Sequence, residues 1–217
     1  MYEEQVLLQV TEPVVLNGRT TISVPMNFKG WLVADQKILK RVEKPCKDQN
    51  VRDLLDRSEY RDYNGKTINV AITPSATDSM LAGWGFGNIH VNNERLKEAY
   101  RVGANGKFSV KVTSGVKLMS AFPGSSTITM EQVRATLSPI FHSIGSSLLG
   151  GYFANTNVSV FEISSCIEEF RKKFYDAVKD EEIFARLGLE LSVFSVNGIH
   201  VPEEDIELIR NRINENE

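Results

Sequence analysis

The chain has 217 residues, of which 41% are apolar and 24% are charged, and its formal net charge at pH 7 is −3. This composition is typical of a globular protein and excludes a largely disordered chain. The slight negative charge argues against broad affinity for nucleic acid, so we expect no nucleic-acid partner. The length suits one large domain or two small ones.

The N-terminal part of the chain is rich in short apolar or β-branched runs separated by turn-forming residues. Five of these runs are expected to be strands: Val6–Val10, Pro13–Leu16, Thr20–Val24, Gly30–Ala34 and Ile38–Val42. Asn17-Gly18 predicts a tight type I′ hairpin over residues 15–20, because this pair tolerates two positive φ angles. Residues 45–50 are expected to form a loop, 51–55 a short helix and 57–66 an exposed, charged turn.

The middle of the chain continues the β pattern. A strand is expected over Thr67–Thr73, and further strands near 89–92 and 95–102. Ala104-Asn105-Gly106 predicts a turn into the strand Lys107–Thr113, whose alternation places Phe108 on a buried face and leaves the other face to solvent.

Two helical stretches follow. Residues 116–122 favour a short helix, and apolar residues at helical spacing predict a longer one over 130–149, kinked or restarted at Pro139 and closed by Gly150-Gly151. Residues 135–161 carry no fully charged side chain, but their proline, glycines and many polar residues favour a core helix over a membrane span.

A long amphipathic helix is expected before Gly188, which is suited to end it. Its apolar face is formed by residues three or four apart, namely Ile163, Ile167, Phe170, Phe174 and Val178. Ser159 and Glu162 form a capping-box pattern at its start. A strand over 189–201 comes next, ended by Pro202, and a terminal helix runs from about 203 to 212.

The order of elements predicts the α+β class: an N-terminal antiparallel β-rich part, then helices, then a returning C-terminal strand. We expect residues 1–217 to form a single domain. The alternative is two subdomains, a β-rich part over about 1–66 and an α+β core over 67–205, with 206–217 starting a C-terminal helix.

The sequence contains no clear signal for catalysis or for a cofactor. Gly83–Asn88 lacks the last glycine of a dinucleotide fingerprint, and Gly103–Lys107 is too short for a P-loop, with Phe108 where a serine or threonine is required. His90, His142 and His200 stand in no metal-binding motif. We therefore predict no catalytic residue, no cofactor and no metal.

The two cysteines are far apart in the sequence. Cys166 lies near the apolar face of the predicted long helix, so we expect a buried thiol and a reducing compartment. The opening Met-Tyr-Glu-Glu has neither a basic region nor an apolar core, so no signal peptide is expected.

The run that closes the domain resembles the end of the SPFH, or band-7, domain of stomatins, prohibitins and flotillins. The matching positions are Gly188, Leu191, Phe194, Val196, Ile199, Pro202, Glu203 and Glu204. Trp84–Ile89, Gly103–Gly106 and Gly106–Val112 are similar to a soluble bacterial subgroup sometimes called virion-core-protein-like. Together the resemblance covers about residues 10–205. Members of that subgroup often continue into a coil and a zinc ribbon, whereas this sequence ends at Glu217.

The resemblance implies a non-enzymatic scaffold that self-associates into a homo-oligomer and organises membrane proteins, with a part in envelope stress. It also implies a cytoplasmic location, with peripheral contact at the inner face of the membrane as the alternative. For self-association we nominate Phe170, Arg171, Lys172 and Phe174 on the long helix. Because acidic residues flank Arg171-Lys172-Lys173, this cluster is expected to be a solvated helix face rather than a lipid-headgroup site.

Two other functions stay open. One is a peptide- or ligand-binding module around the Trp84–Phe86 loop, which requires an exposed Trp84 beside a pocket. The other is a small hydrolase with a dispersed site, which requires a deep polar cleft holding His142 or His200 beside a carboxylate.

Overall fold

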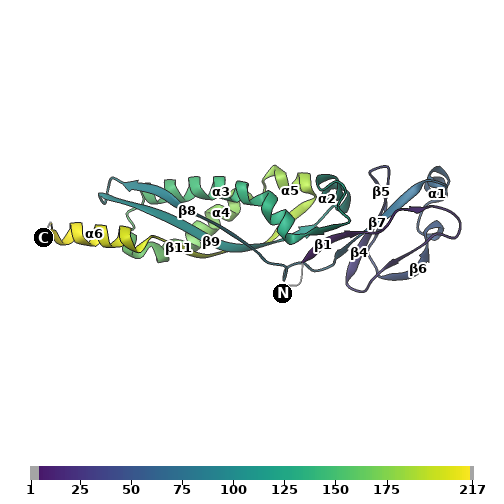
Figure 1. Cartoon of the computed structure of the whole chain (residues 1–217), viewed down its shortest axis with the longest axis horizontal. Helices are drawn as coiled ribbons and strands as arrows, with labels where there is room; N and C mark the ends of the chain where they lie inside the picture. The colour runs from purple at the N-terminus through teal and green to yellow at the C-terminus, as the bar shows by residue number, and fades with distance from the viewer. Residues whose placement is uncertain (1–4, 216–217) are drawn as a thin grey trace. The chain divides into compact units, whose positions relative to one another are not determined.

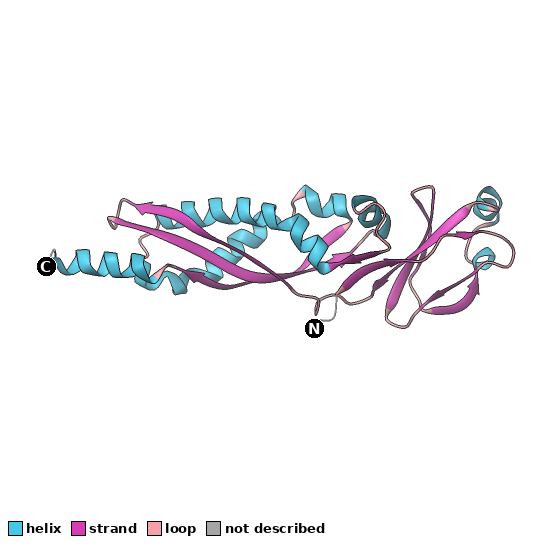
Figure 2. Cartoon of the chain, viewed as in Figure 1, coloured by secondary structure: helices cyan, strands magenta, loops and turns pink. Residues whose placement is uncertain are grey.

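The computed structural model describes residues 5–215, which form two compact units, each assembled from three separate segments of the chain. Unit 1 holds the described residues up to 80 with 110–133 and 182–190; unit 2 holds 81–109, 134–181 and the described residues from 191 on. Figure 1 labels the elements and Figure 2 colours them by type. The prediction of a single domain over 1–217 stays a prediction, as does its alternative of two subdomains with boundaries near 66 and 205.

Unit 1 is built on an antiparallel sheet in the order β10-β1-β7-β4-β5, with β2 paired to β7. These strands are β1 Val6–Val10, β2 Val14–Val15, β4 Phe28–Ala34, β5 Lys37–Val42, β7 Thr67–Pro74 and β10 Thr127–Thr129. β3 Thr21–Val24 and β6 Cys46–Asn50 form a separate two-stranded sheet. The helices of this unit are η1 Val51–Asp53, α1 Arg57–Tyr63, α2 Gly115–Ala121 and α5 Glu182–Leu187.

Alternation along the central strands of unit 1 gives the sheet two buried sides. Leu32, Val70 and Ile72 belong to an apolar cluster that also includes Val24 of β3 and Val51 of η1. The residue one step earlier on β4, Trp31, faces the opposite way and packs on Gly115 at the start of α2, where a Cβ atom would lie 2.9 Å from the indole. α2 therefore covers part of the second face of the sheet.

Unit 2 is a three-stranded sheet in the order β11-β9-β8, with helices packed on one face. The elements are β8 Ala82–Asn93, β9 Glu98–Val112, β11 Leu189–His200, α3 Met130–Asn155, η2 Val160–Cys166, α4 Ile167–Val178 and α6 Glu203–Glu215; β9, β11 and α3 also contribute their ends to unit 1. The core is aromatic. Trp84 of β8 stacks on Phe194 of β11, with ring centroids 5.4 Å apart, and Phe108 of β9 meets Phe141 of α3 edge to face at 4.8 Å.

The α+β class, with antiparallel sheets first, helices after them and a returning strand, is confirmed. Gly188 also behaves as expected, since it has a φ of +68° and a Cβ there would lie 2.5 Å from the carbonyl of Ser114. Cys46 and Cys166 are both free, and Cys166 is buried.

Three local predictions in the N-terminal part are wrong. Residues 15–20 form no hairpin, because β2 pairs with β7 and β3 pairs with β6. The Asn17 side chain instead accepts the N–H of Arg19 at 2.8 Å, which closes a local turn without positive φ at Asn17 or Gly18. The expected loop over 45–50 contains β6, and the expected turn over 57–66 contains α1, where Glu59 accepts the N–H of Asp56.

The turn expected at 104–106 is also wrong, because β9 runs through it without interruption. Gly106 is a glycine for close packing: a Cβ there would lie 1.9 Å from the carbonyl oxygen of Ser195 and 2.5 Å from the Trp84 ring. Gly150-Gly151 likewise does not end α3, which continues to Asn155 with Pro139 inside it.

The long amphipathic helix is divided into η2, α4 and α5. Its expected capping box is absent. The Ser159 hydroxyl donates to the Glu98 carboxylate at 2.8 Å, and the other Glu98 oxygen accepts the N–H of Val160 at 3.1 Å. A buried carboxylate from β9 thus caps this turn in place of a local one.

Candidate functional site

The four residues nominated for self-association lie on α4 but on two different sides of it. Phe170 and Phe174 are fully buried, and Phe174 packs at 5.1 Å from both Trp84 and Phe194. Arg171 is half-buried and Lys172 is exposed. Of the four, only Arg171 and Lys172 offer surface to a second molecule, and the two phenylalanines support that surface from beneath.

The outer face of α4 carries charges of both signs in local pairs. Arg171 donates Nε to Glu168 at 2.8 Å, while Lys173 pairs with Glu169 and Lys179 with Asp176 at the same distance. The Arg171 hydrogen bond lowers the pKa of Glu168, and the Lys179 hydrogen bond lowers the pKa of Asp176. This is the mixed, solvated helix face that the sequence predicted, with its cations largely balanced.

The free edge of β8 is a second candidate surface. β9 pairs with one edge of β8, and among the described residues 5–215 no strand pairs with the other. Edge strands are usually protected from pairing with other chains by charged side chains or by proline. β8 has neither over its twelve residues, with His90 as its one titratable residue.

One edge strand of unit 1, β5, gives a comparison within the same chain. β5 lies at the end of its sheet and carries Lys37, Lys40 and Arg41 within six residues. β8 has only a bulge, marked by a register shift between Phe86 and Ile89 and by the positive φ of Asn88. The segment Ala82–Phe86 before the bulge is therefore a regular edge without charge.

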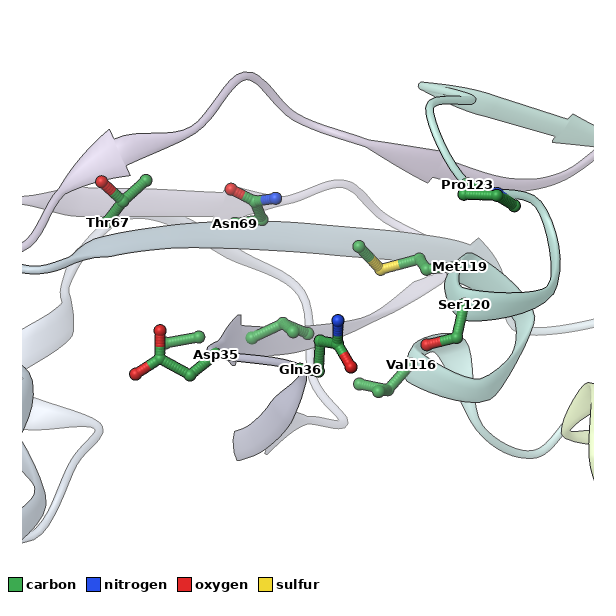
Figure 3. Close-up of a pocket in the computed structure, with 10 residues that line it drawn as sticks. Asp35, Gln36, Thr67, Asn69, Val116, Met119, Ser120 and Pro123 are labelled. Atoms are coloured by element: carbon green, nitrogen blue, oxygen red, sulfur yellow. The ribbon is translucent and has the colours of Figure 1, made fainter.

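Unit 1 contains a groove of about 490 Å³, shown in Figure 3. Its floor is formed by β4 and β7 through Val33, Thr67 and Asn69, where α2 does not cover the sheet. Its remaining walls are lined by Ala34, Asp35 and Gln36 of the β4–β5 turn, by Val116, Met119 and Ser120 of α2, and by Pro123. Figure 3 shows Met119 reaching from α2 over the groove and Asp35 and Gln36 standing on the opposite side from Asn69.

The groove was not predicted from the sequence. Its only local signal in the sequence was a turn expected near Asp35, and many surface loops contain such a turn. Its lining side chains come from positions about thirty and fifty residues apart, so only the fold brings Gln36, Asn69 and Met119 together.

The aromatic-loop hypothesis fails the condition set for it. Trp84 is 5% exposed and Phe86 is 7% exposed, and both belong to the aromatic core of unit 2. His142 and His200 are exposed; His142 lies edge-on to Phe86, with ring centroids 6.0 Å apart, and His200 lies against Gly103. Over residues 5–215 no three or more His, Cys, Asp or Glu side chains are grouped as metal ligands.

Comparison with known proteins supports the family read from the closing motif. A search of curated proteins gives no match. No helix within residues 5–215 is long and apolar enough to cross a membrane. The model of the SPFH domain-Band 7 family matches residues 76–216, which contain β8, β9, β11 and all the helices of unit 2. The chain belongs to the SPFH domain-Band 7 family.

Proposed function

We propose that this chain is a non-enzymatic scaffold that self-associates side by side and organises partner proteins at or near a membrane. The observation that carries the proposal is the uncharged free edge of β8, which contrasts with the edge strand β5 of unit 1 and its three basic residues. A protein that protects one edge and leaves another open has a surface suited to pairing with a second copy.

The geometry suggests how such pairing works. β8 and β11 lie at the two ends of the same sheet, so β8 of one copy can pair with β11 of the next and continue the sheet. An interface between two different surfaces builds rings or rows rather than closed dimers. In such a ring or row, the exposed side of α4, with Arg171 and Lys172, would recur on the surface of every copy. Many weak contacts along such a row give strong overall binding to partners held at a membrane.

The location and the biological setting belong to the same proposal. Similarity of Trp84–Ile89 and Gly106–Val112 to the soluble bacterial subgroup supports a cytoplasmic scaffold with peripheral membrane contact and a part in envelope stress. Membership of the family over residues 76–216 supports a scaffold role in preference to an enzyme, because scaffolding is typical of SPFH proteins.

A charge on the β8 edge tests the proposal. Gly85 is exposed, and a Cβ there would make only an ordinary contact, 3.5 Å from Asn105, so Gly85→Lys should fold normally. We expect this variant to sediment as a smaller species than the parent chain at the same concentration. Ala135→Lys adds the same charge on an exposed helical position of α3 and should leave assembly unchanged. Equal assembly by both variants would contradict pairing through β8.

A further inference from the structure

We propose that the groove of Figure 3 is a docking site for an extended peptide segment of a partner protein, one that carries a lysine or arginine close to an aliphatic residue. The docking site rests on the proposed function: it specifies the chemistry of the partner proteins that the scaffold would organise. All residues that line the groove belong to unit 1, whereas the β8 edge that we assign to self-association belongs to unit 2.

The polar side chains of the groove have hydrogen-bonding capacity to spare. Gln36, Thr67, Asn69 and Ser120 line it, and within residues 5–215 their side chains make no intramolecular hydrogen bond. Amide side chains both donate and accept, which is the pattern that an extended peptide backbone presents. Peptide-binding sites commonly combine hydrogen bonds to the main chain of the peptide with pockets for its side chains.

The apolar side chains provide a place for one aliphatic residue. Val33 is buried in the floor, and Val116 and Met119 are half-buried on α2. Methionine adapts to differently shaped apolar partners because its side chain is unbranched and polarizable. The volume of about 490 Å³ lies within the range of small-ligand sites and suits a few peptide residues rather than a whole helix.

Asp35 supplies the charge that selects a cation. Its carboxylate lies 3.8 Å from Lys66 Nζ, beyond hydrogen-bond distance, and both side chains are more than half exposed. Lys66 also lies over the Tyr63 ring, 4.8 Å from the centroid. The Asp35 oxygens therefore keep acceptor capacity for a lysine or arginine of a bound peptide.

The turn that carries Asp35 and Gln36 is held in an unusual conformation. Their φ angles are +49° and +61°, as in a type I′ hairpin turn, where glycine or asparagine is normally preferred at the second position. A glutamine there is less favourable in the folded state than a glycine, because its Cβ crowds the backbone at positive φ. Strained residues at the rim of a pocket are often retained for what their side chains bind.

The test is an NMR titration of the full ¹⁵N-labelled chain with short blocked peptides that carry Leu and Lys at adjacent or alternate positions. We expect saturable shifts of the side-chain NH₂ signals of Gln36 and Asn69. The same peptides with Glu in place of Lys should bind about two- to five-fold more weakly, the effect of one exposed ion pair. Asp35→Asn should remove that preference. Peptides that leave both NH₂ signals unmoved would overturn the proposal.

A matched pair of variants separates binding in the groove from binding elsewhere. Thr67→Arg fills the groove from an exposed position on β7 and should abolish the shifts, whereas Thr21→Arg adds the same charge on β3 and should not. Shifts of equal size in both would overturn the assignment. Gly85→Lys keeps the two proposals distinct: peptide binding by a chain that does not assemble supports the groove, and its absence in a chain that does assemble counts against the groove alone.

Discussion

Asp205, in the first turn of α6, takes the place of a strand partner for Arg101 on β9. One carboxylate oxygen of Asp205 accepts both the backbone N–H of Arg101, at 2.7 Å, and its Nε, at 3.0 Å. The other oxygen accepts Nη2 at 2.8 Å, and Glu204 contacts the same guanidinium. Because Asp205 is buried and Ile209 packs one turn later, these bonds fix the start of α6 on the sheet of unit 2.

This pair should make stability depend on pH in the acid range. The Arg101 hydrogen bond holds the pKa of Asp205 below its ordinary value of 3.8. The stabilisation is therefore complete above that value and is lost as pH falls below it towards the folded-state pKa. We expect Asp205→Asn to lower the urea midpoint at neutral pH and to flatten its fall in acid. Asp62→Asn, on exposed α1, is the control, and an unchanged acid slope in Asp205→Asn would contradict the account.

Two glycines of the sheet in unit 2 should lose very different amounts of stability when replaced by alanine. A Cβ at Gly106 would lie 1.9 Å from a backbone oxygen, which cannot move aside cheaply, so Gly106→Ala should reduce the free energy of unfolding by about 3 kcal/mol. Gly87→Ala meets nothing within 4 Å and should change it by less than about 0.5 kcal/mol. Urea unfolding of both variants measures the difference; equal effects would show that close strand packing is not what Gly106 provides.

Glu98 should contribute more to the free energy of unfolding than a surface carboxylate does. It is buried and satisfies both the Ser159 hydroxyl and the Val160 N–H at the start of η2. Glu98→Ala leaves that N–H without a partner in the core, so we expect a loss of about 1–3 kcal/mol in the free energy of unfolding. Glu94→Ala, at an exposed position before the same strand, should cost less than about 0.5 kcal/mol. Similar costs for the two would contradict the capping role.

One substitution in the β4–β5 turn should raise the stability of the chain and weaken its binding of peptide. Gln36→Gly relieves the strain at φ +61° but frees the unfolded chain, so a net gain of about 0.5–1 kcal/mol in the free energy of unfolding is expected. The same change removes one amide from the groove and should weaken peptide binding. Denaturant unfolding and the peptide titration measure the two effects on one protein. A variant that is less stable would show that the turn is not strained.

Apolar residues that recur every second residue, or every third or fourth, were sufficient to predict the buried strand at 107–113 and the buried face of α4. The alternation in Lys107–Thr113 and the helical spacing from Phe170 to Val178 each correspond to a buried face in the structure. The positive φ at Gly188 was likewise evident from a glycine that follows a helical pattern. These features depend on neighbours along the chain, which a sequence displays directly.

Features set by distant partners were not predictable in the same way. Gly106 looked like a turn residue, but its role depends on Ser195 and Trp84. Ser159 looked like a helix cap, but its partner is Glu98, 61 residues away. The nominated surface on α4 shows the same limit, because the spacing that places Phe170 and Phe174 on one face cannot say whether that face meets the core or another chain.

The measurement that bears most directly on the scaffold proposal is the mass of this chain in solution, by light scattering, from micromolar to near-millimolar concentration, with and without anionic liposomes. The proposal predicts a mass that rises with concentration above the 24.3 kDa of one chain, less steeply in Gly85→Lys than in Ala135→Lys. Sedimentation of the chain together with the liposomes would support the membrane contact. A mass of one chain at every concentration, with no binding to liposomes, would contradict self-association through β8. The chain would then be a member of its family without that activity.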